Sequence, residues 1–168
     1  VRAVQLASKL KVPYFVLGGG SNLLVSDQGF TGLVIKVGAK QITVKGNKLI
    51  VESGVKLADL LKKTVDLGLT GLEFTTGVPG TVGGAIRGNG GAWQQKIGDK
   101  VVRVQVITGE GQVAWVNRNE ANFGYRQSGF KSSNQVILKV ELELEKGDPN
   151  QIKKAIEANL AKRDNQPK

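Results

Sequence analysis

Alternating and clustered hydrophobic residues predict β-strands along much of the chain. Short apolar runs at 14–17 and 32–37 indicate two buried strands. The segments 41–53 and 100–116 each predict a β-hairpin, the first with a two-residue turn at 46–47. Trp115, on the second hairpin, is expected in the core.

A further strand is predicted at 136–147, where apolar and charged residues alternate with a period of two. One solvent-exposed face on this strand implies that part of the sheet is antiparallel. Inward positions are Leu138, Val140, Leu142 and Leu144, and outward positions are Lys139, Glu141, Glu143 and Glu145.

Helical spacing of apolar residues predicts three main helices. The first covers 1–11 and ends before Pro13, with Ala3, Val4, Ala7 and Leu10 on one face. The second covers 56–67. The third begins with Asp148 as N-cap and Pro149 in the first helical position, and Pro167 would end it. Its apolar stripe is Ile152, Ala155, Ile156 and Leu160. Short strands together with these helices place the chain in the α+β class.

Composition excludes several kinds of chemistry. The 168 residues contain no cysteine and no histidine, which removes disulfides, a cysteine nucleophile, a Ser-His-Asp triad and His/Cys metal sites. No metal site is expected, and redox chemistry would need a bound organic cofactor. No apolar run approaches the roughly 20 residues that span a bilayer, so we expect no membrane partner and a cytoplasmic location.

The net charge of +10 favours an anionic partner such as a nucleotide or phosphate. Nucleic acid is not expected as that partner, because the basic residues are scattered and aromatic residues are not interleaved with them. A basic nucleic-acid-binding domain, whose affinity would fall steeply as the salt concentration rises, is kept as an alternative function.

The first glycine-rich loop follows the strand at 14–17 and contains Gly18, Gly19 and Gly20, then Ser21 and Asn22. It does not match the dinucleotide-binding fingerprint, because position 23 is leucine and no helix follows. Glycine permits positive φ angles and close approach to backbone N–H groups, which can form an anion-binding nest. A tight turn without a ligand is the alternative.

The second glycine-rich segment, at 71–98, contains nine glycines. Thr81 is expected to cap a short helix starting near Val82, and glycines at 83 and 84 would let that helix lie against a ligand or another backbone. Asn89 is expected to organise its loop by bonding backbone or a bound ligand, and Trp93 to anchor packing. Two such loops indicate a long ligand, such as a dinucleotide.

Several motifs, in order, resemble the UDP-N-acetylenolpyruvoylglucosamine reductase family, also called UDP-N-acetylmuramate dehydrogenases. The segments "VPYFVLGGGSNLLVSDQGFTGLVIKV" and "GLEFTTGVPGTVGGAIRGNGGAW" are similar to its flavin-binding signatures. "FGYRQSGFK" resembles its tyrosine–arginine segment, and "GDPNQIKKAIEANLAKRDNQP" resembles the helix before its last domain. Arg87 stands where the family often carries a bulky or apolar residue.

The resemblance implies an FAD-binding fold of the PCMH/vanillyl-alcohol-oxidase type, with two small α+β subdomains and the flavin between them. Residues 1–37 would belong to the N-terminal FAD-binding subdomain, and 38–148 would form the second one. Residues 149–168 would lead to a C-terminal substrate-binding domain that this sequence does not contain.

The same resemblance implies roles for individual residues. The pyrophosphate would be held by Gly18, Gly19, Gly20, Ser21 and Asn22. Arg126 would be catalytic, stabilising the enol formed when hydride arrives, and would bind substrate together with Tyr125. The flavin and ribityl chain would be lined by Thr76, Gly77, Pro79, Gly80, Thr81, Gly83, Gly84, Asn89, Gly91 and Ala92.

The implied reaction uses NADPH to reduce FAD, and then reduces UDP-N-acetylglucosamine enolpyruvate, a nucleotide sugar, to UDP-N-acetylmuramate in peptidoglycan synthesis. The family's proton-donating serine and an assisting glutamate lie in C-terminal segments that are absent from this sequence. The chain is therefore expected to be the FAD-binding portion and inactive alone. Alternatives are a non-catalytic flavin- or nucleotide-binding module, and another flavin oxidoreductase of the same fold.

Overall fold

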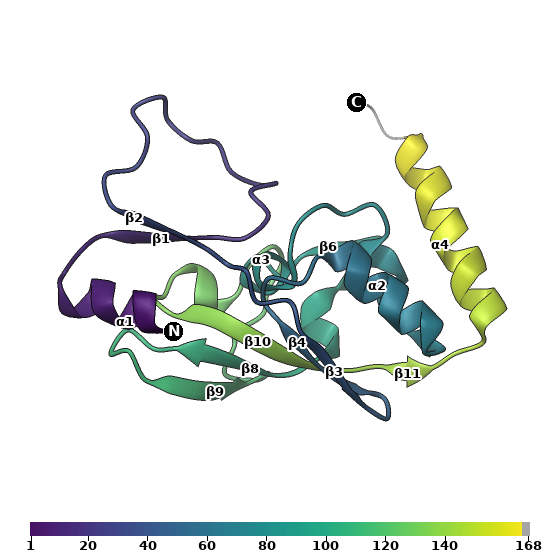
Figure 1. The fold of residues 1–168 in the computed structure, drawn as a ribbon. Helices are drawn as coiled ribbons and strands as arrows, with labels where there is room; N and C mark the ends of the chain where they lie inside the picture. Colours follow the sequence, from purple (N-terminus) through teal and green to yellow (C-terminus); the bar gives the residue numbers. More distant parts are fainter. Residues whose placement is uncertain (166–168) are drawn as a thin grey trace.

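The computed structural model describes residues 1–165, and its chain forms a small lobe beside a larger one (Figure 1). In the small lobe, helix α1 (Arg2–Lys9) is followed by the parallel strands β1 (Tyr14–Leu17) and β2 (Leu33–Lys36). Both strands lie where the apolar runs predicted them, but the prediction that they are buried is wrong. Phe15 is 39% exposed and Val34 is 48% exposed, because only Tyr14, Val16 and Ile35 pack against an apolar cluster. The predicted helix end at Pro167 lies outside the described residues.

The larger lobe is built on an antiparallel sheet with strand order β3-β4-β10-β8-β9. Both predicted hairpins are confirmed in it, and Gly46 in the first turn has a φ of 62°, which glycine adopts without strain. The strands are β3 (Ile42–Lys45), β4 (Lys48–Glu52), β8 (Val101–Ile107), β9 (Val113–Asn117) and β10 (Val136–Glu143).

Helices α2 (Leu57–Asp66) and α3 (Val82–Arg87) contribute apolar side chains to the core that the sheet's inner face also lines. Helix α4 (Pro149–Asp164) packs against α2 and the short helix η1 (Glu73–Thr75) (Figure 1). Asp148 caps α4 as predicted, accepting from the N–H groups of Asn150 and Gln151 at 2.9 Å. The remaining short elements are β5 (Leu69–Thr70), β6 (Gly91–Ala92), β7 (Gln95–Lys96), η2 (Ile97–Lys100), η3 (Gly129–Lys131) and β11 (Glu145–Lys146).

The outer face of the sheet differs from prediction at two positions. Glu141 keeps its predicted side of β10 but is only 9% exposed, because Arg103 on β8 lies directly opposite and pairs with it at 2.6 Å. Trp115 is half-buried on this same outer face rather than in the core, and the Arg103 guanidinium stacks 4.3 Å from its ring centre. Polar and aromatic side chains therefore cover a face of the sheet that the alternating pattern alone predicts to be exposed to solvent.

The predicted stripe of α4 is partly wrong. Ile152 is buried, but Ala155 is exposed and Leu160 is 45% exposed. The buried side of the helix continues instead through Asn159 and Arg163, which donate to backbone carbonyls. The helix borders irregular backbone that needs hydrogen-bond donors, so polar side chains complete its packed face.

The first helix is also less buried than predicted. Val4 and Ala7 are buried, whereas Ala3 is exposed and Leu10, just after the end of α1, is 62% exposed. Two buried positions thus anchor α1, and one of them, Val4, belongs to a second apolar cluster with Ile107 and Val136. None of the helices within residues 1–165 has the length and apolar character needed to cross a membrane.

Candidate functional site

The two glycine-rich segments meet in space although about sixty positions separate them in sequence. The Ser21 hydroxyl donates to the Pro79 carbonyl at 3.3 Å. A Cβ on Gly19 would lie 3.0 Å from the Gly80 Cα, and one on Gly18 would lie 2.7 Å from the Thr81 Oγ1. The loops therefore approach closely only because these positions carry no side chain.

The second loop is fixed where it enters α3. Thr81 caps α3 as predicted, accepting from the Gly84 N–H at 3.4 Å. The first two N–H groups of the helix, those of Val82 and Gly83, donate at 2.8 Å to the carbonyls of Val55 and Ser53, respectively. A Cβ on Gly83 would lie 2.7 Å from the Ser53 Cβ, so Gly83 is required by packing against another part of the chain.

Asn89 organises the loop that follows α3. It is buried, with a φ of 43°, and its amide nitrogen donates to the Gly124 carbonyl at 2.8 Å. Its amide oxygen accepts from the Gly98 N–H at 3.0 Å. The expectation that its amide bonds backbone is confirmed. A Cβ on Gly91, in β6, would lie only 2.1 Å from the Gln95 carbonyl oxygen, so the small hairpin itself requires glycine there.

Tyr125 and Arg126 occupy the two central positions of a tight turn. Gly124 and Gln127 exchange backbone hydrogen bonds, at 2.9 Å and 3.3 Å. Arg126 has a φ of 53°, a conformation that costs a non-glycine residue free energy. Tyr125 is 87% exposed, so it does not belong to the core. The turn therefore presents both side chains at the surface.

This turn is tied to the end of α3. The Arg87 guanidinium donates to the carbonyls of Phe130 at 2.5 Å and Lys131 at 3.2 Å. The Ser128 hydroxyl donates to the Arg87 carbonyl at 2.6 Å. The segment that carries Arg126 and the second glycine loop are thereby held together. Within residues 1–165, no hydrogen bond joins the Arg126 turn to the first glycine loop.

Helix α4 contacts the start of the second loop through a residue that sequence reasoning missed. The Arg163 Nε donates to the Thr76 carbonyl at 2.5 Å, and a Cβ on Gly77 would lie 2.8 Å from the Arg163 Cδ. Trp93 packs against the core as expected, with the Lys162 Nζ 5.4 Å from its ring centre. The only sequence signal for Arg163 was its helical spacing from Ile152.

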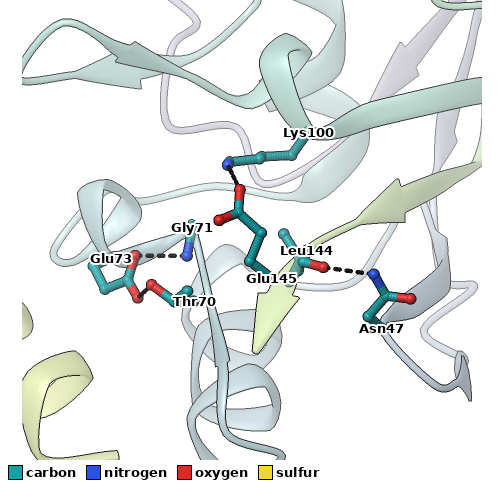
Figure 2. Close-up of polar contacts among 7 residues, drawn as sticks. All are labelled: Asn47, Thr70, Gly71, Glu73, Lys100, Leu144 and Glu145. Atoms are coloured by element: carbon teal, nitrogen blue, oxygen red, sulfur yellow. Dashed lines mark hydrogen bonds and ion pairs between the residues drawn. The ribbon is translucent and has the colours of Figure 1, made fainter. Parts of the chain in front are cut away.

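Glu73 stabilises the chain just before this loop (Figure 2). Its carboxylate accepts from the Thr70 hydroxyl at 2.7 Å and from the Gly71 N–H at 2.8 Å. Lys100 extends over the same region to an ion pair with Glu145 at 3.5 Å (Figure 2). Glu73 thus caps a loop, and its oxygens are occupied by the protein itself.

Comparison with known proteins adds independent evidence. A family model described as "FAD binding domain" matches residues 1–117. The UDP-N-acetylenolpyruvoylglucosamine reductase of Clostridium kluyveri is 42% identical over 99% of this chain and 55% of its own length. That of Alkaliphilus oremlandii is 39% identical over 89% of this chain and 50% of its own length. The chain spans about half the length of these curated relatives.

Solved structures agree with these sequence matches. The crystal structure of the reductase (MurB) from Thermus caldophilus aligns with a TM-score of 0.85 at 33% identity, covering 97% of this chain and 60% of that one. An alkyldihydroxyacetonephosphate synthase shares the fold, with a TM-score of 0.63 at 19% identity over 86% of this chain and 29% of its own. The predicted α+β FAD-binding fold of the PCMH type is confirmed. This chain therefore belongs to the FAD-binding domain family and is a homologue of the UDP-N-acetylenolpyruvoylglucosamine reductases.

Proposed function

We propose that the chain binds FAD at the junction of its two glycine-rich loops, as the FAD-binding portion of a flavin-dependent reductase. The observation that carries this proposal is the side-chain-free contact between Gly19 and Gly80. Such a contact leaves bare backbone where an anionic oxygen can approach closely. The predicted subdomain boundaries near residues 37 and 148 belong to this proposal.

The first loop fits the pyrophosphate of a dinucleotide. The N–H groups of Gly19, Gly20, Ser21 and Asn22 donate to no protein acceptor within residues 1–165. Gly20 has a φ of 77°, a left-handed conformation of the kind that turns successive N–H groups toward one concavity. Four donors on an exposed loop, in a chain of net charge +10, suit a doubly charged anion.

The second loop would hold the flavin end of the cofactor. Its predicted contacts are Thr76, Gly77, Pro79, Gly80, Thr81, Gly83, Gly84, Asn89, Gly91 and Ala92. Of these, Gly83 and Gly91 also have structural reasons to be glycine, and the amide of Asn89 is bonded to backbone. We therefore assign flavin contact mainly to the backbone of this loop rather than to its side chains.

The proposed reaction is the reduction of UDP-N-acetylglucosamine enolpyruvate, the substrate class implied by the names of the relatives. FAD, when bound, would supply the hydride to the substrate, after receiving it from NADPH. Arg126 would bind the enolpyruvyl carboxylate with two hydrogen bonds and stabilise the negative charge that develops on it. Because the charge grows along the reaction, the guanidinium favours the transition state over the ground state.

Arginine suits this role because it stays charged and presents a planar pair of donors. Losing one such contact typically raises the barrier by about 3 kcal/mol. Tyr125, beside it in the same turn and 87% exposed, is free to contact the substrate. The proton that completes the reduction needs a further donor, which we expect outside this chain.

An absorption experiment tests the cofactor proposal. The purified chain is incubated with FAD and desalted, and its visible spectrum is recorded beside that of a Gly19→Val variant. We expect the wild-type chain to retain a flavin spectrum and the variant to lose it. A chain shown to be folded by circular dichroism that retains no flavin would contradict the proposal.

Activity decides between the reductase and the alternative, a non-catalytic flavin-binding module. The longer polypeptide that contains this chain is assayed for NADPH oxidation that depends on the enolpyruvyl nucleotide sugar. Turnover that falls by about two to three orders of magnitude in Arg126→Ala supports the reductase. Flavin binding without any turnover in that polypeptide favours the module.

A further inference from the structure

Arg87 connects the end of α3 to the segment that carries Arg126. Its guanidinium bridges two successive carbonyls, those of Phe130 and Lys131, at 2.5 Å and 3.2 Å. The reverse bond, from the Ser128 hydroxyl to the Arg87 carbonyl at 2.6 Å, closes the connection. A planar fork of donors holds two carbonyls in a fixed relative orientation, which a single donor cannot do.

The other side of the same turn is held from α3 as well. Asn89 lies two residues beyond Arg87 and donates to the Gly124 carbonyl at 2.8 Å. Gly124 begins the turn, and Phe130 and Lys131 follow its end. The turn is therefore braced on both sides by residues 87 and 89, which lie where α3 meets the second glycine loop.

The brace supports a conformation that the turn does not favour by itself. The third position of such a turn, with positive φ, usually carries glycine, and here it is Arg126, with a φ of 53°. A strained backbone persists only where its surroundings fix it. Contacts from Arg87, Ser128 and Asn89 fix the backbone on either side of it, and the Lys131 Nζ donates to the Arg126 carbonyl itself at 3.4 Å.

The bonds of Arg87 indicate that it acts on backbone rather than on a ligand. Within the described residues its guanidinium donates to two neutral carbonyls and pairs with no carboxylate. Arg126 is itself a cation, so Arg87 acts on it through geometry and not by charge attraction. A shift of about 1 Å in a group that binds reacting atoms can cost a hundredfold in rate.

We propose that Arg87 is a positioning residue, which sets the place of Arg126 relative to the flavin-binding loop. This inference rests on the proposed function, in which Arg126 binds the substrate carboxylate. In this proposal the Arg87 guanidinium stays on the Phe130 and Lys131 carbonyls and contacts neither substrate nor cofactor, so its effect on catalysis passes through the turn at 124–127. Removing it should therefore matter only while Arg126 is present.

A double-mutant cycle tests this dependence in the longer polypeptide with FAD bound. Arg87→Met removes the fork and keeps the length of the side chain, and we expect kcat/KM to fall about tenfold, the loss typical of one charge-assisted hydrogen bond. Arg87→Lys restores one donor and should recover part of that loss. Arg87→Met added to Arg126→Ala should change kcat/KM no further.

Two further measurements separate positioning from general stability. Hydrogen exchange of the peptide covering 123–131 should become faster in Arg87→Met, while FAD affinity stays the same. Arg103→Met is the matched control, because Arg103 also makes a bond of 2.6 Å, but on the outer face of the sheet. That control should lower thermal stability without changing exchange at 123–131 or kcat/KM.

Each outcome decides the inference. The same fold loss from Arg87→Met in the presence and absence of Arg126, or no loss at all, would overturn it. So would loss of folding in both Arg87 variants, because the residue would then be a general stabiliser. A third outcome is that Arg87→Met speeds hydrogen exchange at 123–131 while Arg126→Ala leaves kcat/KM unchanged. The proposed function would then fail, and Arg87 would hold a turn that has no catalytic role.

Discussion

The contact between the two glycine-rich loops can be tested by adding a single methyl group at Gly19. Its Cβ would lie 3.0 Å from the Gly80 Cα, whereas ordinary contacts begin at 3.4 Å. The loops must therefore separate by about 0.4 Å or more, the difference between those two distances. The added Cβ is fixed by its own backbone and the Gly80 Cα is a backbone atom, so no side-chain rotation relieves the contact.

The expected cost falls on FAD binding rather than on folding. Overpacking of this kind typically costs about 1–3 kcal/mol, which corresponds to a dissociation constant raised between about fivefold and about 150-fold. Gly19 and the residues at 20–34 are exposed, so the loop can move away in the chain without FAD. We expect the free energy of unfolding of the apo chain to change by less than about 0.5 kcal/mol.

The assay is a titration of FAD fluorescence quenching with Gly19→Ala, beside thermal denaturation of the apo protein. Gly38→Ala is the control, because a Cβ there meets nothing within 4 Å and its φ lies outside the left-handed region. Equal FAD affinity in the two variants would refute the argument that the closed contact forms the binding site. A loss of stability as large as the loss of affinity would refute it as well.

Three other substitutions have expected outcomes. Asp148→Ala removes the N-cap of α4 and should lower the free energy of unfolding by about 1 kcal/mol in urea denaturation. Gly83→Ala should lower the free energy of unfolding by about 1–3 kcal/mol because of its contact with Ser53. Gly84→Ala, whose added Cβ has its nearest neighbour at 3.6 Å, should raise the free energy of unfolding through better helix propensity, and urea denaturation measures both. Arg126→Gly relieves positive φ and should raise thermal stability by the equivalent of about 0.5–1 kcal/mol, while turnover is lost.

Features with short-range causes could be predicted from the sequence. The turn at Gly46, the cap at Thr81 and the cap at Asp148 each follow from a residue and its immediate neighbours, and all three are confirmed. The strands at 14–17 and 136–143 followed from hydrophobic patterning alone, although the burial predicted for the first of them is wrong. In these places local preference and tertiary structure agree, which is what foldable sequences require.

Features with long-range causes could not be predicted. The bond from Arg87 to Phe130 spans 43 positions, and that from Arg163 to Thr76 spans 87. No periodicity encodes such a pair, because each partner is a backbone carbonyl that any residue could supply. The wrong stripe on α4 has the same origin, since apolar spacing cannot show that a helix will face backbone acceptors.

Positive φ outside glycine is concentrated in two segments, both of which belong to the proposed site. Six non-glycine residues within 1–165 have positive φ, and all but Lys11 lie in two segments: Asn89, Trp93, Gln94, Asn122 and Arg126. The first segment belongs to the second glycine loop, and the other carries the Arg126 turn. Glycine would relieve the strain at each position, so a side chain that makes specific contacts gives a reason for the residue found there. The Asn89 side chain makes two hydrogen bonds to backbone, and the Trp93 side chain packs against the core.

The Arg126 side chain is different. The described structure shows no hydrogen bond or core packing for its guanidinium, and binding of a ligand would give the reason for an arginine at this strained position.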